Sequence, residues 1–341
     1  MSATFQSHVL APIQKHTGHK IKVPTREGLE WGYEEGPDFR EVQLTIDAAA
    51  MCSKLRGDGP ASPMLALCLA AALEGTPGAP VRAAVEVVGD IPPEPGLGYK
   101  TSKELLLFRR SAFLLHTLEE LLPERFLLTA PDRAGWAWPK WSWFSVEKRG
   151  KNKPRPASGP ARVAFEMEIS PRIYAEFGEG MEPIRRFQGK FPVVVHSSEV
   201  SKESNYTVGG KTGIPLWVAS ADHRRVHLFE LETSKKPGVG GLAEALCNAA
   251  MLDHVFHGNG HFDTNKAVGL AAVRRARRMV MWMFADEYHP LVFDEKTGDS
   301  TILRWLNEPL SRRSFRFGVL PWAGEAANPQ IRFDARWGGG L

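Results

Sequence analysis

Apolar residues along the first third of the chain recur at spacings that predict alternating helices and strands. Residues 61–74 are apolar and helix-forming, and residues 80–88 form a short apolar run typical of a strand. A longer helix is predicted from residue 101 or 102, where Thr or Ser can cap it, to residue 122, because its leucines recur at helical spacing. The pattern indicates a protein that mixes both element types.

The second half continues this alternation. Residues 163–170 alternate between apolar and polar positions, residues 191–200 form another apolar run, and residues 214–232 predict two strands joined by a turn. Residues 240–256 then place leucines and alanines along one helical face. No internal repeat is evident. We therefore expect an α/β fold with a central mixed sheet flanked by helices.

Turn-forming segments suggest how the chain is divided. Residues 89–98, rich in Gly and Pro, give the best boundary, which predicts an N-terminal α/β extension over 1–98 and a larger domain over 99–341 with its core at about 163–290. Four tryptophans within residues 136–144 suit packing against a core better than stacking on bases. The basic, proline-rich residues 147–162 predict an exposed loop.

Composition narrows the class of protein. With 341 residues, 43% of them hydrophobic and 24% charged, the chain can bury a core, which excludes a disordered or fibrous protein. The net charge of +4 permits an anionic partner. Three cysteines without metal-ligand spacing argue against a disulfide scaffold or zinc module. No run reaches the roughly 18 apolar residues of a membrane span, so we expect a cytoplasmic protein that does not enter membranes.

The segment LFELETSKKPGVGGLAEAL concentrates charged residues around a strand end. Glu230 and Glu232 lie two apart on the predicted strand, so their side chains project to the same face. Lys235 and Lys236 follow, and Glu244 lies on the next helix. Carboxylates on a rigid strand with a nearby ammonium are what Mg²⁺-dependent phosphodiester hydrolysis requires.

This order of an apolar strand, an acidic and basic cluster, and a helix bearing Glu resembles the core of the PD-(D/E)XK nuclease superfamily, over about residues 190–257. The resemblance implies a restriction-endonuclease-like fold and a nuclease dependent on Mg²⁺ or Mn²⁺. It would act on nucleic acid, DNA in particular, in prokaryotic defence or repair. Glu230 and Glu232 would bind the metal, Lys235 would orient water or stabilise charge, and Glu244 would support the metal or the lysine.

Two positions depart from the pattern of that family. The strand before the acidic strand normally supplies an Asp, but Pro215 stands there, and Asp222 falls in the predicted turn. Glu232 occupies the usual lysine position, so Lys235 would act as a displaced lysine. The alternative is a catalytically inactive nuclease-fold protein that serves as a nucleic-acid-binding or scaffold subunit. A protein partner or a homodimer is compatible with both hypotheses.

A second basic group comprises Arg274, Arg275, Arg277 and Arg278. On a helix, Arg274 and Arg278 would share a face and Arg275 would lie about 100° away, so the group would form a broad basic surface that could follow a nucleic-acid backbone together with Lys235 and Lys236. A solvated face is an equally ordinary interpretation, but the position directly after the nuclease-like segment favours phosphate contact.

Other motifs are weaker. The glycines within HGNGH disfavour a helix that would bring His257 and His261 to one metal. The glycines after Lys236 lack the residues of a phosphate-binding loop, and no G-x-S-x-G motif is present.

Overall fold

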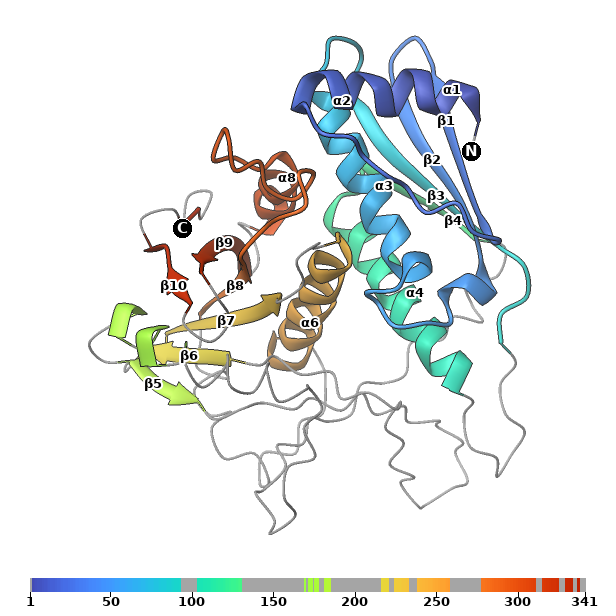
Figure 1. Ribbon diagram of the computed structural model, residues 1–341. Helices are drawn as coiled ribbons and strands as arrows, with labels where there is room; N and C mark the ends of the chain where they lie inside the picture. Colours follow the sequence, from blue (N-terminus) through green and yellow to red (C-terminus); the bar gives the residue numbers. More distant parts are fainter. Residues whose placement is uncertain are drawn as a thin grey trace, which may run out of the picture. The chain divides into compact units, whose positions relative to one another are not determined.

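A computed structural model describes residues 2–92, 103–130, 169, 171–173, 175–177, 181–184, 216–220, 224–232, 238–257, 277–310, 315–324, 329–333 and 336–337. The chain forms two compact units (Figure 1). Unit 1 comprises Met1–Trp138, Gly238–Cys247 and Tyr288–Pro309, and unit 2 comprises Pro139–Pro237, Asn248–Glu287 and Leu310–Leu341. The α/β class is confirmed. The chain has two mixed sheets, one in each unit.

Unit 1 is built on a four-stranded sheet in the order β1-β2-β3-β4. The strands are β1 (Leu29–Glu35), β2 (Arg40–Asp47), β3 (Val81–Val88) and β4 (Phe126–Thr129). β1 and β2 form an antiparallel hairpin, and β3 and β4 add to it in parallel. Along β3, buried and more exposed residues alternate, as expected for a sheet whose two faces differ in cover.

Two helices connect the parallel strands of unit 1: α3 (Asp58–Glu74), which packs against β2 and β3, and α4 (Lys103–Leu121), which packs against β4 (Figure 1). α3 is buried on nearly all sides, which explains its almost uniformly apolar sequence. The N-terminal segment forms α1 (Ala3–Phe5), the π-helix η1 (Gln6–Leu10) and α2 (Ala11–Thr17), and the 3-10 helix η2 (Ala48–Met51) follows β2. The predicted boundary at residue 98 falls inside unit 1, because α4 and β4 complete its sheet.

Unit 2 contains a six-stranded sheet in the order β10-β9-β8-β7-β6-β5. The strands are β5 (Met181–Ile184), β6 (Leu216–Ser220), β7 (Arg225–Glu232), β8 (Arg278–Ala285), β9 (Phe315–Ala323) and β10 (Gln330–Ile331). β5, β6 and β7 pair antiparallel, β7, β8 and β9 pair in parallel, and β10 returns antiparallel. The predicted hairpin within residues 214–232 is confirmed.

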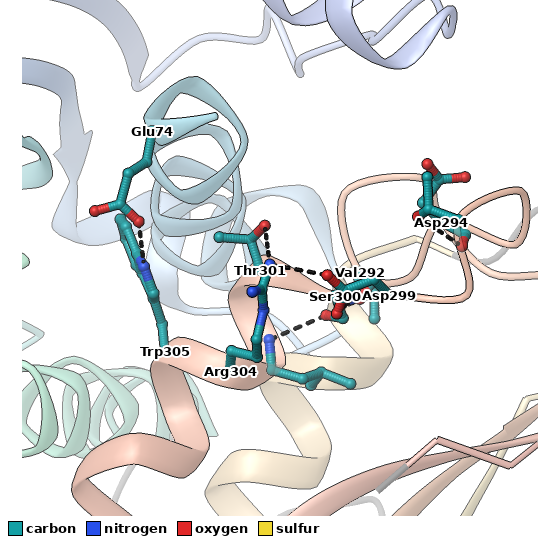
Figure 2. A network of polar contacts seen from close by, with 10 residues as sticks. Glu74, Val292, Asp294, Asp299, Ser300, Thr301, Arg304 and Trp305 are labelled. Atoms are coloured by element: carbon teal, nitrogen blue, oxygen red, sulfur yellow. Dashed lines mark hydrogen bonds and ion pairs between the residues drawn. The ribbon is translucent and has the colours of Figure 1, made fainter. Parts of the chain in front are cut away.

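Two further helices follow strands of the second sheet along the chain: α6 (Gly240–His257) confirms the helix predicted for residues 240–256, and α8 (Thr301–Leu310) precedes β9. Ser300 caps α8, because its Oγ accepts a hydrogen bond from the Leu303 N–H at 3.0 Å. Within unit 1, Trp305 of α8 donates from Nε1 to Glu74 Oε2 at 2.6 Å (Figure 2). Among the described residues, no helix is long and apolar enough to cross a membrane.

One face of the second sheet carries an aromatic cluster. Its buried members come from four strands and from helical residues before β5, and they are Ile169, Ile173, Val218, Phe229, Val280, Trp282, Phe284, Leu320 and Trp322. Ile169 is helical, so the strand predicted for 163–170 is wrong at that residue. The segments 136–144, 147–162 and 191–200 lie outside the described residues.

The arginine cluster adopts a different structure from the predicted helix. Arg278 is the first residue of β8, and the Met, Val, Trp and Phe residues after it are buried. A strand with parallel neighbours on both sides is covered on both faces, so its sequence is continuously apolar and lacks the alternation that would identify it. A helical face shared by Arg274 and Arg278 is therefore wrong at Arg278, while Arg274 lies outside the described residues.

Candidate functional site

The candidate site lies at the carboxyl end of β7, where the sequence places Glu230 and Glu232. β7 is the third strand of the antiparallel run and the first of the parallel run, so it has a neighbour on each side. Val226, Leu228 and Phe229 are fully buried along it, and they fix the strand in the sheet. Glu230 follows directly and is only 2% exposed. The strand geometry puts Glu230 and Glu232 on one face.

The parallel partner β8 brings further carboxylates to this edge. Glu230 pairs with Met283 and Glu232 with Ala285, the last residue of β8. Asp286 and Glu287 come next in the chain. Asp286 is half-buried, and its Oδ1 accepts a hydrogen bond from the Glu287 N–H at 3.0 Å. Ligands of α/β sheets commonly bind at the carboxyl ends of parallel strands, so Asp286 joins the candidate residues.

Sequence reasoning missed Asp286, although a signal for it exists. The apolar run MVMWMFA stops abruptly at two adjacent acids, as the run VHLFELE stops among charged residues. Two such runs that end in acids would point to neighbouring parallel strands. Asp286 was missed because a continuously apolar run has no alternation that would identify it as a strand.

His227 lies on the opposite face of β7 from Glu230 and belongs to the aromatic cluster. Its Nδ1 accepts a hydrogen bond from Trp282 Nε1 at 3.0 Å, and the Phe177 ring lies 4.7 Å from its own. Burial, with the positive charges of Arg225 and Arg336, lowers the pKa of His227 to about 4. The imidazole is therefore neutral at physiological pH and has a structural role in the cluster.

Glu244 lies in unit 1 on α6, where two arginines bind its carboxylate. Arg56 Nε lies 2.6 Å from Oε2, and Arg110 Nη2 lies 3.2 Å from Oε1. Burial opposes ionisation, but the charges and hydrogen bonds of Arg110 and Arg56 outweigh it and lower the pKa of Glu244. The structure thus gives both carboxylate oxygens guanidinium partners. The support that Glu244 would give to a metal or to the lysine stays a prediction.

A close backbone approach helps to build this arginine-bound carboxylate. A Cβ added to Gly240, in the first turn of α6, would lie 2.7 Å from Arg56 Cα. Glycine is therefore required where the chain before α3 crosses the start of α6. Gly240 thus allows tight packing between these two segments.

The structure describes only some of the basic residues that the sequence singled out. Lys235, Lys236, Arg274 and Arg275 lie outside the described residues, as do Pro215 and Asp222. Arg278 lies at the amino end of β8, paired with Arg225. With about 3.3 Å per residue, the strand length separates this end from Glu232 by roughly 23 Å. We name the carboxyl ends of β7 and β8, with Glu230, Glu232 and Asp286, the acidic edge. The structure therefore does not bring Arg278 to the acidic edge.

Four exposed arginines gather at that amino end, and we name them the arginine edge: Arg224, Arg225, Arg277 and Arg278. The backbone N–H groups of Arg277 and Arg278 both donate to the Arg224 carbonyl, at 2.8 and 3.1 Å. These bonds hold together two segments that are far apart in the sequence. The second sheet thus has arginines at one end and carboxylates at the other.

Whether a metal ion fits the acidic edge depends on the protein oxygen atoms that could bind it there. Glu230, Glu232 and Asp286 offer the hard carboxylate oxygens that Mg²⁺ prefers, and Mg²⁺ commonly needs one or two protein carboxylates beside water and phosphate. Within the described ranges, no group of three or more His, Cys, Asp or Glu side chains gathers as a metal site. The assignment of Glu230 and Glu232 as the residues that would hold the ion stays a prediction.

Comparison with known proteins adds no relative. No model of a known protein family matches the chain, and no match was found among curated proteins or among solved structures.

Proposed function

We propose that this protein is a metal-dependent nuclease whose site is the acidic edge of the second sheet. The observation that carries the proposal is the pair Glu230 and Glu232 on one face at the end of β7, beside the parallel strand β8, which Asp286 follows directly in the chain. Further support comes from the chain order of β6, the acidic strand β7, α6 and the parallel strand β8. The acidic strand followed by a helix is the part of this order on which the resemblance to the PD-(D/E)XK superfamily rests.

Each residue of the proposed site has a defined task. Glu230 and Glu232 hold Mg²⁺ or Mn²⁺, which when bound supplies positive charge to a phosphoryl oxygen. The oxygen of a water molecule forms a new bond to phosphorus, the bond from phosphorus to one sugar oxygen breaks, and that oxygen takes up a proton. Lys235 supplies the ammonium that orients the water or stabilises the charge that develops. The products are a phosphate monoester and a hydroxyl group.

Cleavage of nucleic acid tests the proposal directly. Supercoiled plasmid, linear duplex and single strands are incubated with Mg²⁺ or Mn²⁺ and the full chain. We expect Glu230→Gln to abolish cleavage, because it removes a carboxylate charge at nearly constant volume. Glu41→Gln is the matched control, since Glu41 is another buried strand carboxylate, 7% exposed and ion-paired with Arg82 at 2.8 Å. Equal loss in both variants would contradict the proposal.

The arginine edge favours a second candidate, a nucleic-acid-binding protein that does not cut. Four exposed guanidinium groups can follow a phosphate backbone, and Pro215 stands where an acidic ligand is expected. Replacement of Arg278 and Arg225 by Gln should lower affinity and reduce the slope of log K against log salt by about 0.9 for each lost phosphate contact. Salt-sensitive binding with no cleavage at any metal concentration would establish this candidate in place of the nuclease.

The resemblance extends the nuclease proposal to restriction of foreign DNA or to repair. An RNA duplex added to the cleavage assay tests this extension, which a preference for duplex DNA would support.

A further inference from the structure

The two sheets share one order of elements along the chain. In the first, an antiparallel hairpin of β1 and β2 is followed by α3, the parallel strand β3, α4 and the parallel strand β4. In the second, the hairpin of β6 and β7 is followed by α6, the parallel strand β8, α8 and the parallel strand β9 (Figure 1). Both runs place their strands in sequence order across the sheet.

The strand registers agree as well. The hairpins align through a shared R-x-V-x-L pattern that starts at Arg40 in β2 and at Arg224 just before β7. In this alignment, a tryptophan of the neighbouring strand pairs with the leucine in both hairpins. β4 and β9 both begin at a buried phenylalanine, and the two phenylalanines lie at the same register position of their sheets. Residues paired across the four strands show this equivalence: they are Trp31, Leu44, Val85 and Leu128 in the first sheet, and Trp217, Leu228, Met281 and Phe317 in the second.

The connecting helices carry matching residues. α3 contains A-L-C-x-A-A-x-L from Ala66, and α6 contains the same pattern from Ala245, so two of the three cysteines of the chain fall at equivalent positions. The second helices match as L-x-x-L-x-E-x-L from Leu115 and from Leu303, a few residues before Phe126 and Phe315. Leucine and alanine alone recur by chance in helices, but these patterns lie at the same places in both runs.

We infer that the chain contains two copies of one β-β-α-β-α-β module and that the second copy alone can hold the metal. In the alignment, Glu230 and Glu232 correspond to Ile46 and Ala48, which are both fully buried. Apolar packing in the first copy occupies the positions of the proposed ligands. A hydrocarbon side chain offers no oxygen to Mg²⁺.

This inference rests on the proposed nuclease function and specifies how it acts on duplex DNA. Because only the second copy has the proposed ligands, a monomer hydrolyses one phosphodiester bond in each encounter and leaves a nick. The first copy contributes a fold without chemistry. The repeat escapes a search for patterns along the sequence, because the copies share few positions and their connections differ in length.

The test combines a metal-binding readout with a plasmid assay on the full chain. Asp47→Asn is the first-copy control, since Asp47 ends β2 and its Oδ1 accepts the Ala49 N–H at 2.7 Å, a bond that Asn retains. We expect Mn²⁺ to raise the melting temperature of the wild type and of Asp47→Asn but not of Glu230→Gln. With plasmid in excess, open circles should accumulate before linear DNA. Glu230→Gln should slow nicking at least 100-fold, since even the partners that orient metal ligands are worth about 10–100-fold.

The outcomes distinguish the proposed nuclease function from the inference that only the second copy holds the metal. Cleavage by monomeric protein that yields linear DNA without an open-circle intermediate, or cleavage that falls with Asp47→Asn as much as with Glu230→Gln, would overturn the single-site inference and leave the nuclease standing. Absence of both the Mn²⁺ shift and cleavage in the wild type would remove the nuclease, and the inference with it.

Discussion

Neutralising Glu244 should destabilise unit 1, because its carboxylate holds two guanidinium groups together. The side chains of Glu244, Arg56 and Arg110 are 21%, 31% and 13% exposed, so water screens these contacts only in part. Removing one partner of a fully buried ion pair costs about 3–5 kcal/mol, and a surface pair is worth about 0–1 kcal/mol. For Glu244→Gln we therefore expect a loss of about 2–3 kcal/mol at pH 7.

The assay is urea unfolding followed by circular dichroism, with each transition fitted separately because two units need not unfold together. Glu124→Gln serves as control, since Glu124 is an exposed carboxylate of the same unit. A double-mutant cycle with Arg110→Met should give a coupling of about 1–3 kcal/mol. A loss below about 0.5 kcal/mol for Glu244→Gln would refute the reasoning, because it would mean that solvent already screens the cluster.

The pH dependence gives a second check on Glu244. Its pKa is lower in the folded state than the ordinary value of 4.5, so the folded state binds fewer protons and the ion pairs stabilise it above that pH. This stabilisation is lost as pH falls from about 4.5 through the folded pKa, and Glu244→Gln should flatten stability over that window. A Mn²⁺ shift that vanishes in this variant would instead show that Glu244 supports the metal.

Three further changes test other contacts. Gly240→Ala should cost about 1–3 kcal/mol, because its Cβ would meet Arg56 Cα at 2.7 Å, whereas Gly238→Ala, whose nearest atom is 3.9 Å away, should be tolerated; equal melting temperatures would contradict this. The pKa of His227 falls from 6.5 to about 4 on folding, so stability should drop by about 3 kcal/mol as pH falls from 6.5 to 4 and then level off. His227→Gln should remove that slope, and an NMR titration showing an imidazole pKa near 6.5 would refute it. Trp305→Phe removes the 2.6 Å hydrogen bond to Glu74 and weakens the stacking of the Arg125 guanidinium, which lies 4.4 Å from the ring centroid, so it should cost about 1–3 kcal/mol in urea unfolding; no change would show that the hydrogen bond is weak.

Local periodicity explains why several elements could be predicted. The helices at 61–74 and 240–256 and the hairpin within 214–232 depend on spacings and turn residues that are neighbours in the chain. The same reasoning correctly put Glu230 on a strand. The residues of β8 show its limit, because a strand buried on both faces has no alternation to distinguish it from a helix.

The division of the chain shows a second limit. A Pro- and Gly-rich stretch predicts a turn, but it does not say whether the elements on its two sides share a sheet. β3 and β4 flank such a stretch and still pair in parallel, since a helical crossover returns the chain to the same sheet. The first unit also includes residues 238–247 and 288–309, which are distant in sequence.

By itself, the sequence determined the α/β class, the main local elements and the shared face of Glu230 and Glu232, because side-chain direction follows from spacing within one element. Tertiary structure alone decided that β8 pairs with β7 and brings Asp286 to the acidic edge, and that Arg56 and Arg110 bind Glu244. These contacts join residues far apart in the chain, so they depend on strand pairing and helix packing, which no local pattern encodes.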